Sequence, residues 1–249
     1  GVLESLWGER LRGARVYSTV SHRHVYGMLF RVLWPLLERR PFATFDLEYP
    51  EQLVEPELAG HVLISSPALL KRIGHLPASS ASWRAIFSSG GLLPADAARD
   101  AAGVLGFCSV EVPGSTETSG VAWREQTSAN ALAFRTMPSV ETRAGAEAFL
   151  EVRSPFTGQQ GWLQMGDMVR LSAHGTFELL GRGDHLAKIE DKRISLAEIE
   201  RHLLETPWVA DAAAGALDAG ARQYVGVVLK LSPAGTQRLD EEGRRAVGE

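Results

Sequence analysis

Short apolar segments alternate with helical segments in the first half of the chain, and this alternation constrains the fold most. The apolar runs at 61–65, 84–89 and 107–112 have the length and composition of buried strands. A helix is expected after Ser66-Pro67 and another over Pro94–Val104, because Pro is favoured in the first turn of a helix. Such alternation predicts an α/β fold, with a mostly parallel sheet and flanking helices.

Apolar spacing predicts further elements before the first of these strands. The opening residues resemble the end of an amphipathic helix, and residues 15–20 form a short strand. A helix over 25–37 follows, and we expect its apolar face to be covered only by a more N-terminal part of the protein. That face is formed by Val25, Met28, Leu29, Val32, Leu33 and Leu36.

The pattern changes twice along the chain. Short alternating segments divided by Gly, Pro and Ser predict a small β-barrel-like layer after residue 120. From 184 onward, Ser195 and Glu198 form a capping box that begins a helix, and two strand-like segments follow. We therefore expect three parts: an α/β part (1–120), a β-rich layer (121–183) and a truncated α+β subdomain (184–249).

Composition excludes several classes of protein. The 249 residues carry 26 Lys+Arg against 30 Asp+Glu, and the net charge of -4 gives no reason to expect nucleic-acid binding. The single cysteine, Cys108, rules out an internal disulfide framework. No apolar run is long enough to span a bilayer and no signal peptide opens the chain, so we expect a cytoplasmic protein without a membrane partner. Without an initial Met, the sequence is expected to begin inside a longer one.

Three small-residue segments carry candidate chemistry. In Gly114–Gly120, Thr116 could bind a phosphate and Glu117 could hold Mg²⁺. Gly90-Gly91 would let the main chain lie against a flat ring such as adenine. Asp167 could bind ribose hydroxyls, with Arg182 near phosphate. Taken alone, each segment is more often a polar loop, a tight turn or an exposed charged loop.

Other catalytic patterns are missing from the sequence. There is no G-x-S-x-G elbow, no G-x-G-x-x-G after a strand and no G-x-x-x-x-G-K-[ST] loop. His22 and His24 are two apart, but no Cys, His or carboxylate cluster adds the ligands that a metal would need.

The order of five motifs is similar to that in adenylate-forming (AMP-binding) ligases. This superfamily includes acyl- and aryl-CoA synthetases, the adenylation domains of peptide synthetases, and luciferase. The resemblance covers residues 16–231, and its most specific part is GRxDxxxKxxxxRIxxxEIE. The motifs in chain order are SHRHVYG, IFSSGGLLP, EVPGSTETSG, GWLQMGDMVRL and FELLGRGDHLAKIEDKRISLAEIE.

The resemblance implies a role for each candidate residue. It implies ATP and Mg²⁺ as cofactors, with catalytic roles for Thr116, Glu117 as the metal ligand, Arg193 near phosphate, and His24 beside the carboxylate substrate. Asp184 would be the hinge of a mobile C-terminal subdomain. The nucleotide would be bound by Gly90, Gly91, Gly114, Thr116, Asp167 and Arg182.

The chain departs from the family pattern in four places. Pro113 stands where an aromatic residue usually stacks on adenine, and Asp191 stands where many CoA-using members have Gly. The phosphate loop of the TSGSTGxPK type and the C-terminal catalytic Lys are not found in the sequence. The SHRHVYG segment looks most like ligases of aryl-polyene and related pigment pathways, which are similar to enzymes that load aromatic acids onto an acyl carrier protein.

The resemblance implies ATP-dependent activation of an aromatic or fatty carboxylic acid as acyl-adenylate. Transfer to a thiol of an acyl carrier protein or of CoA would follow. As an incomplete fragment, this chain alone is expected to be inactive and to self-associate through its uncovered helix and the strand at 62–65. The alternative is a degenerate, non-catalytic module of the same fold that binds a nucleotide or a partner.

Overall fold

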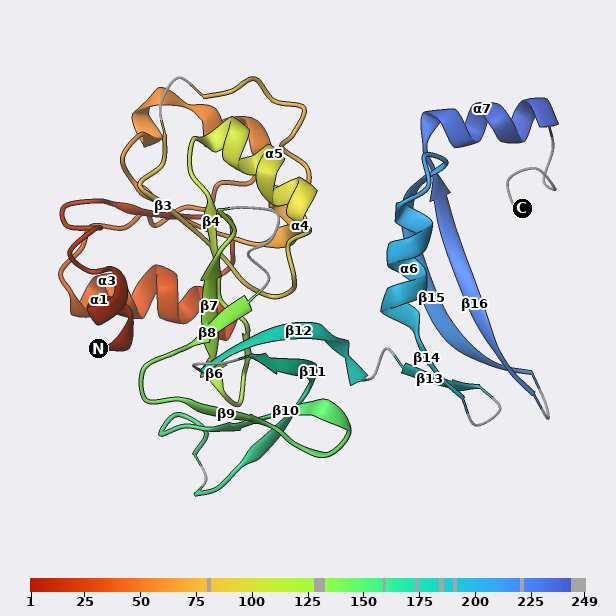
Figure 1. Cartoon of the computed structure of the whole chain (residues 1–249). Coiled ribbons are helices and arrows are strands. Elements are labelled where there is room, and N and C mark those ends of the chain that lie inside the picture. Colours follow the sequence, from red (N-terminus) through yellow and green to blue (C-terminus); the bar gives the residue numbers. More distant parts are fainter. Residues whose placement is uncertain are drawn as a thin grey trace. The chain divides into compact units, whose positions relative to one another are not determined.

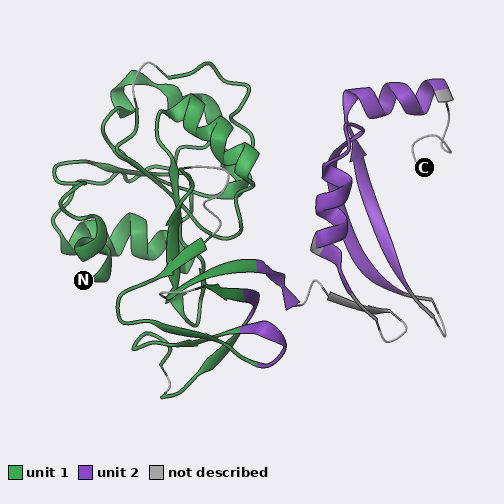
Figure 2. Cartoon of the chain, in the orientation of Figure 1, with its two compact units in different colours: residues 1–145, 150–165, 170–179 green, residues 146–149, 166–169, 180–249 purple. Residues whose placement is uncertain are grey.

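The chain forms two compact units (Figure 2). The computed structural model describes residues 1–79, 82–127, 133–158, 160–172, 175–183, 186–189, 192–219 and 222–242. Unit 1 comprises Gly1–Gly145, Leu150–Met165 and Arg170–Leu179. Unit 2 comprises Ala146–Phe149, Gly166–Val169 and Leu180–Glu249. The expected boundaries at 120 and 183 stay a prediction.

A four-stranded parallel layer forms the centre of unit 1 (Figure 1). Its strands are β1 (Val16–Ser18), β2 (Val62–Ser65), β3 (Ala85–Ser88) and β4 (Ser109–Glu111), paired in that order. Each strand is buried along its whole length, as its apolar composition requires. The α/β fold predicted from the alternating segments is confirmed.

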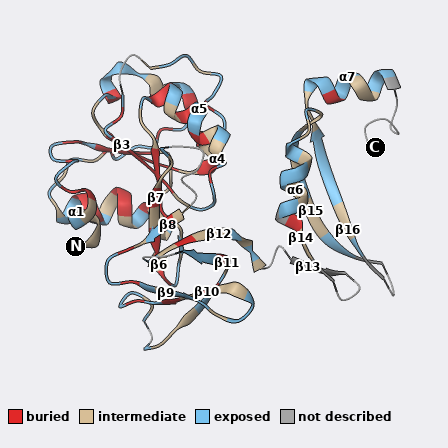
Figure 3. Cartoon of the chain, in the orientation of Figure 1, coloured by how far each residue is buried: buried red, intermediate tan, exposed pale blue. Residues whose placement is uncertain are grey.

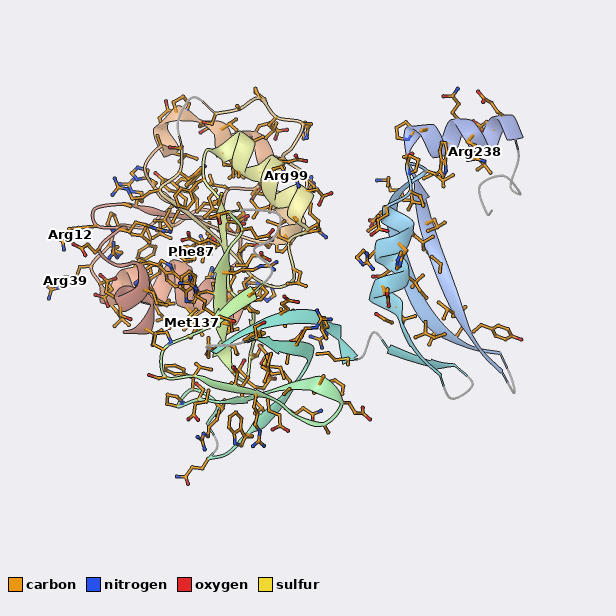
Figure 4. The ribbon with its side chains drawn as sticks, in the orientation of Figure 1. Arg12, Arg39, Phe87, Arg99, Met137 and Arg238 are labelled. Carbon is orange, nitrogen blue, oxygen red and sulfur yellow. The ribbon has the colours of Figure 1, made fainter. Side chains whose placement is uncertain are left out.

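Helices cover both faces of this layer. Leu63 and Ile86 pack with the buried face of α5 (Ala95–Leu105) in one continuous apolar core. On the other face, Phe87 contacts the ring of Trp7 in α1 (Val2–Trp7) at 4.9 Å between centroids (Figures 1 and 4). The shorter helices are α2 (Val25–Gly27), a π-helical segment (Met28–Leu33), α3 (Trp34–Leu37), the 3₁₀ turns Pro50–Val54, Pro56–Leu58 and Ala146–Ala148, and α4 (Pro67–Leu70).

The helical run 25–37 forms as expected, and no residue of its predicted apolar face is buried. Phe30 and Trp34 face the core, where their ring centroids lie 5.3 and 5.8 Å from that of Phe87. Arg31 is also buried, and donates to the carbonyls of Val20 at 3.1 Å and Phe45 at 3.2 Å. The exposed positions are instead Met28, Leu33, Leu36 and Leu37.

The expectation that strand 62–65 exposes apolar surface is wrong. Val62, Leu63 and Ile64 are at most 1% exposed. The reason is that the two apolar layers described above cover both faces of β2, and β1 and β3 pair with its two edges.

An antiparallel layer continues the sheet beyond β4, as expected for the β-rich region. The ten strands lie in the order β1-β2-β3-β4-β7-β8-β12-β11-β10-β9. Short cross-strand connections and stacked Phe134 and Phe177 hold this layer together. The added strands are β7 (Ala122–Glu125), β8 (Ala133–Thr136), β9 (Glu141–Ala144), β10 (Phe149–Arg153), β11 (Leu163–Ser172) and β12 (Thr176–Arg182).

Unit 2 contains two hairpins and two helices. The Ser195 side chain caps α6 (Leu196–Leu204) by accepting from the backbone N–H of Glu198 at 3.1 Å, which is the first half of the predicted capping box. The remaining elements are β13 (Leu186–Ile189), β14 (Lys192–Ser195), β15 (Val209–Ala219), β16 (Arg222–Leu231) and α7 (Pro233–Glu242). Figure 3 shows that β16 is largely exposed. Within the described ranges, every helix is too short or too polar to cross a membrane.

Candidate functional site

The carboxyl ends of the four parallel strands meet at one edge of the sheet, where a cavity of about 520 Å³ opens. The residue directly after each strand lines it: Thr19 after β1, Ser66 after β2, Ser89 after β3 and Val112 after β4. This edge is where open α/β sheets bind ligands. The other lining residues are Val20, Ser21, His24, Val25, Tyr26, Leu29, Phe30, Gly90, Gly114, Ser115, Thr116, Ser119 and Gly120.

The cavity brings together four of the residues proposed from the sequence. His24, Gly90, Gly114 and Thr116 line it, although they come from three separate segments. Gly90 has a φ of 89°, so the turn after β3 uses a backbone conformation that favours glycine. Gly91 and Glu117 each follow a lining residue in sequence but do not line the cavity themselves.

The segment 114–120 is a tight hairpin of β5 (Gly114–Ser115) and β6 (Ser119–Gly120). The Thr118 hydroxyl accepts from the backbone N–H of Ser115 at 3.0 Å, and the two hydroxyls lie 3.1 Å apart. A Cβ on Gly114 would lie 2.0 Å from the carbonyl oxygen of Ser119, so no larger residue fits there. Ser115 and Thr118 therefore hold the hairpin, while Thr116 and Glu117 stand exposed at its tip.

The carboxyl group of Glu117 is held in its charged form. The Ser115 hydroxyl and the backbone N–H of Glu117 itself lower the pKa of this carboxyl below its ordinary value of 4.5. A charged carboxylate beside hydroxyl oxygens is the kind of ligand that Mg²⁺ prefers. Among the described residues no cluster of three or more His, Cys, Asp or Glu could hold a metal, so a Mg²⁺ here would complete its coordination with phosphate oxygens and water.

Tyr26 is a cavity residue that the sequence analysis did not select. Burial raises the pKa of its phenol well above 10.0, and the nearby backbone of Ser65 offsets part of that rise. The side chain therefore stays neutral, and its hydroxyl oxygen is buried although the residue lines the cavity. Its place two residues after His24 in the HVYG segment was the available signal.

A buried ion pair fixes the loop that carries Gly90 and Gly91. Glu111, at the end of β4, is 2% exposed and pairs with Arg124 of β7 at 2.8 Å. Its second oxygen accepts from the backbone N–H of Leu93 at 2.9 Å. Gln126 donates both to the carbonyl oxygen of Leu93 and to Glu111, which ties the loop to two strands. In the sequence, the signal for this ion pair was the single carboxylate of Glu111 within the apolar run 107–112.

The remaining candidate residues belong to unit 2. Asp167 in β11 and Arg182 in β12 each make a polar interaction. A Cβ on Gly166 would lie 3.0 Å from Nη2 of Arg182, so the guanidinium passes over the backbone next to Asp167. The proposed hinge residue Asp184 lies outside the described residues. Arg193 lies in β14, and its side chain is outside the part of the chain that the structure describes.

Comparison with known proteins supports the family. The chain is 26% identical over 202 residues to a 4-coumarate–CoA ligase of Cereibacter sphaeroides, covering 80% of the chain and 46% of that ligase. A 55-residue stretch is 44% identical to an L-proline–[L-prolyl-carrier protein] ligase of Pseudomonas fluorescens, covering 22% of the chain and 11% of that ligase. The chain is similar in sequence to these ligases, as the order of its motifs indicated. No protein-family model matches it.

The fold of this chain is also found in solved structures. ATP-bound MatB from Rhodopseudomonas palustris superposes with a TM-score of 0.80 at 20% identity. The superposition covers 98% of this chain and 56% of the MatB chain. This chain thus spans about half the length of the relatives it matches.

Proposed function

We propose that this chain takes part in ATP-dependent activation of a carboxylic acid. In the first step, a carboxylate oxygen forms a bond to the α-phosphorus of ATP, the bond to the β-phosphate bridge breaks, and pyrophosphate leaves. In the second step, a thiol sulfur bonds to the acyl carbon of the adenylate, AMP leaves, and the thiol proton passes to water. The observation that carries the proposal is the cavity at the carboxyl edge of β1–β4.

Each candidate residue has a defined task in this proposal. Thr116 donates a hydrogen bond to the α-phosphate, and His24 borders the carboxylate. Gly90 and Gly91 allow the adenine and the acyl group to lie against the main chain. Asp167 and Arg182 bind the ribose and an adjacent phosphate, and Arg193 approaches phosphate. This catalysis works by positioning and by neutralising charge.

Mg²⁺ would be held by Glu117 together with the phosphates of ATP. When bound, it would neutralise the charge that develops on the leaving pyrophosphate. Glu117 lies one residue beyond the cavity lining, on the exposed tip of the hairpin, where a hydrated ion has room for its water ligands.

The proposed substrate is a carboxylic acid, and the proposed acceptor is a thiol. The cavity has both polar and apolar walls, which suits an aromatic or aliphatic carboxylic acid. The acceptor is a thiol of a carrier protein or of CoA, and the similarities to a CoA ligase and to a carrier-protein ligase support both. We expect the reaction to take place in the cytoplasm.

Calorimetric titration tests the proposal with the full 249-residue chain. The first ligand is Mg·ATP, and the second is benzoyl-sulfamoyl-adenosine, a stable analogue of an acyl-adenylate. We expect the analogue to bind at least 10²-fold more tightly than ATP, because it occupies the carboxylate and nucleotide positions together. Thr116→Val and Asp167→Ala should each weaken both ligands about tenfold.

The control is Thr127→Val, since Thr127 is exposed and lies outside the cavity lining. It should leave both affinities unchanged. Binding of Mg·ATP without preference for the analogue would favour the degenerate nucleotide-binding module. No binding of either ligand would refute the proposal for this chain.

A further inference from the structure

Arg31 is a buried charged residue that the proposed reaction does not use. Its side chain is 5% exposed, and a buried charge is costly unless it is paired and hydrogen-bonded. The residue belongs to the π-helical segment Met28–Leu33, in which Leu29 and Phe30 line the cavity. π-helical turns are rare and are often found at functional sites. Arg31 is thus next in sequence to the cavity wall without lining the cavity itself.

The guanidinium of Arg31 joins three segments of the chain. Its Nη1 donates to the carbonyl oxygen of Val20 at 3.1 Å, and its Nη2 donates to the carbonyl oxygen of Phe45 at 3.2 Å. The carboxylate of Asp46, which is 41% exposed, pairs with Nη1 and balances the buried charge. One side chain therefore ties the helical run 25–37 to the turn after β1 and to the loop at 45–46.

The turn that Arg31 holds forms part of the cavity wall. Val20, Ser21 and His24 all line the cavity. The backbone N–H of His24 donates to the carbonyl oxygen of Ser21 at 3.3 Å. A Cβ on Gly27 would lie 2.2 Å from that same oxygen, so the turn packs tightly against the start of the helical run. A shift of the backbone at Val20 would therefore also move His24.

A second buried arginine, Arg40, lies near the amino end of β1 and offers a comparison. Its side chain is 9% exposed and pairs with the carboxylate of Glu4 at 2.8 Å. It donates to the carbonyl oxygens of Leu11 at 2.5 Å and Gly8 at 2.8 Å. Both arginines thus bind two carbonyl oxygens and one partly exposed carboxylate. They differ in place, because Arg40 and its partners do not line the cavity, whereas Arg31 holds a segment that does.

We propose that Arg31 is a positioning residue for the carboxylate side of the cavity. It acts through Val20 and the turn that carries His24, and it touches neither substrate nor nucleotide. Its contacts fix this backbone before a ligand arrives, so less ordering is needed on binding. The inference rests on the proposed function, in which His24 borders the carboxylate. Gly90 and Thr116, which are assigned to the nucleotide, come from other segments, so loss of Arg31 should affect the two halves of a ligand unequally.

The test uses calorimetry with the full chain and two ligands, Mg·ATP and benzoyl-sulfamoyl-adenosine. Arg31→Met removes the charge and the forked donors but keeps an unbranched side chain. We expect it to weaken the analogue about tenfold and Mg·ATP by less than about twofold, because only the acyl end of the analogue reaches the turn at 19–24. Arg40→Met is the matched control. It should lower the midpoint of urea denaturation to a similar extent and leave both affinities within about twofold.

Asp46→Asn is a milder variant that decides the question if Arg31→Met does not fold. It removes the balancing charge and should weaken the analogue about threefold, with Mg·ATP unchanged. Equal weakening of both ligands would show a merely structural role and overturn the proposal. A wild-type preference for the analogue that survives in both variants would overturn this inference alone and leave the proposed function standing. A wild-type chain that binds neither ligand, or that shows no preference for the analogue, would overturn both.

Discussion

At the scale of single residues, the buried carboxylate of Glu111 carries the largest expected effect on stability. Glu111→Ala leaves Arg124 buried without its charged partner, and we expect a loss of about 3 kcal/mol in the free energy of unfolding. Glu125→Ala is the control, because its pair with Arg10, at 2.9 Å, is partly exposed and should be worth less than about 1 kcal/mol. Urea denaturation measures both variants. Equal losses would contradict this account of the network.

His61 makes stability depend on pH. Partial burial lowers the pKa of its imidazole below 6.5, and the charges of Arg15 and Arg84 lower it further. The unfolded chain therefore binds a proton first as the pH falls. The stabilising contribution is complete above about pH 6.5 and is lost as the pH falls through the folded pKa. His61→Gln should flatten the loss of stability in denaturant titrations between neutral and mildly acidic pH, whereas His22→Gln, at an exposed position, should leave the slope unchanged.

At the scale of elements, two glycines of α5 should respond to alanine in opposite directions. Gly106 ends the helix with a φ of 69°, and a Cβ there would lie 2.5 Å from Cβ of Ser82. Gly106→Ala should destabilise the protein by at least about 1 kcal/mol. Gly103 lies inside the helix with open space around it, so Gly103→Ala should stabilise by up to about 1 kcal/mol. Thermal unfolding curves would show midpoint shifts of opposite sign, and shifts of one sign would refute the assignment of the cap.

The helical run 25–37 shows where sequence patterns suffice and where they do not. Apolar spacing predicted that the segment is helical. It did not predict which side is buried, because Arg31 looks like an interruption and its partners, the carbonyls of Val20 and Phe45, lie in loops. The π-helical segment Met28–Leu33 has no separate signal in the sequence. Such long-range contacts decide burial.

At the scale of the whole molecule, the end of the helical run 25–37 exposes apolar side chains on unit 1. Leu36 and Leu37 are 60% and 77% exposed at the end of the helical run. We expect the isolated chain to self-associate through them, since apolar side chains gathered at one place favour association. Light scattering should show a mass that rises with concentration, and the double substitution Leu36→Lys with Leu37→Lys should abolish that rise. A monomeric wild-type chain at every concentration would contradict this expectation.

The succession of strands along the chain predicted both layers of the large sheet, because each strand carries its own apolar signal. The grouping of His24, Gly90, Gly114 and Thr116 followed from the resemblance to adenylate-forming ligases and from the rule that parallel strands end at one edge. Glu111 and Tyr26 were not predicted, since their roles depend on neighbours from other strands. The sequence also did not show that two hydroxyls, rather than the glycines alone, hold the hairpin at 114–120.

The placement of the cavity separates the residues that hold the fold together from the residues that contact a ligand. The residues inside β1–β4 contribute packing, whereas the residues just after each strand contribute contacts to whatever is bound. Mutations at the strand ends can therefore accumulate and alter what the cavity binds with little effect on folding. A protein descended from this chain could change what it binds without a change in its packed interior. We expect sequence variation among its relatives to concentrate at Thr19, Ser66, Ser89 and Val112 before it reaches the strands themselves.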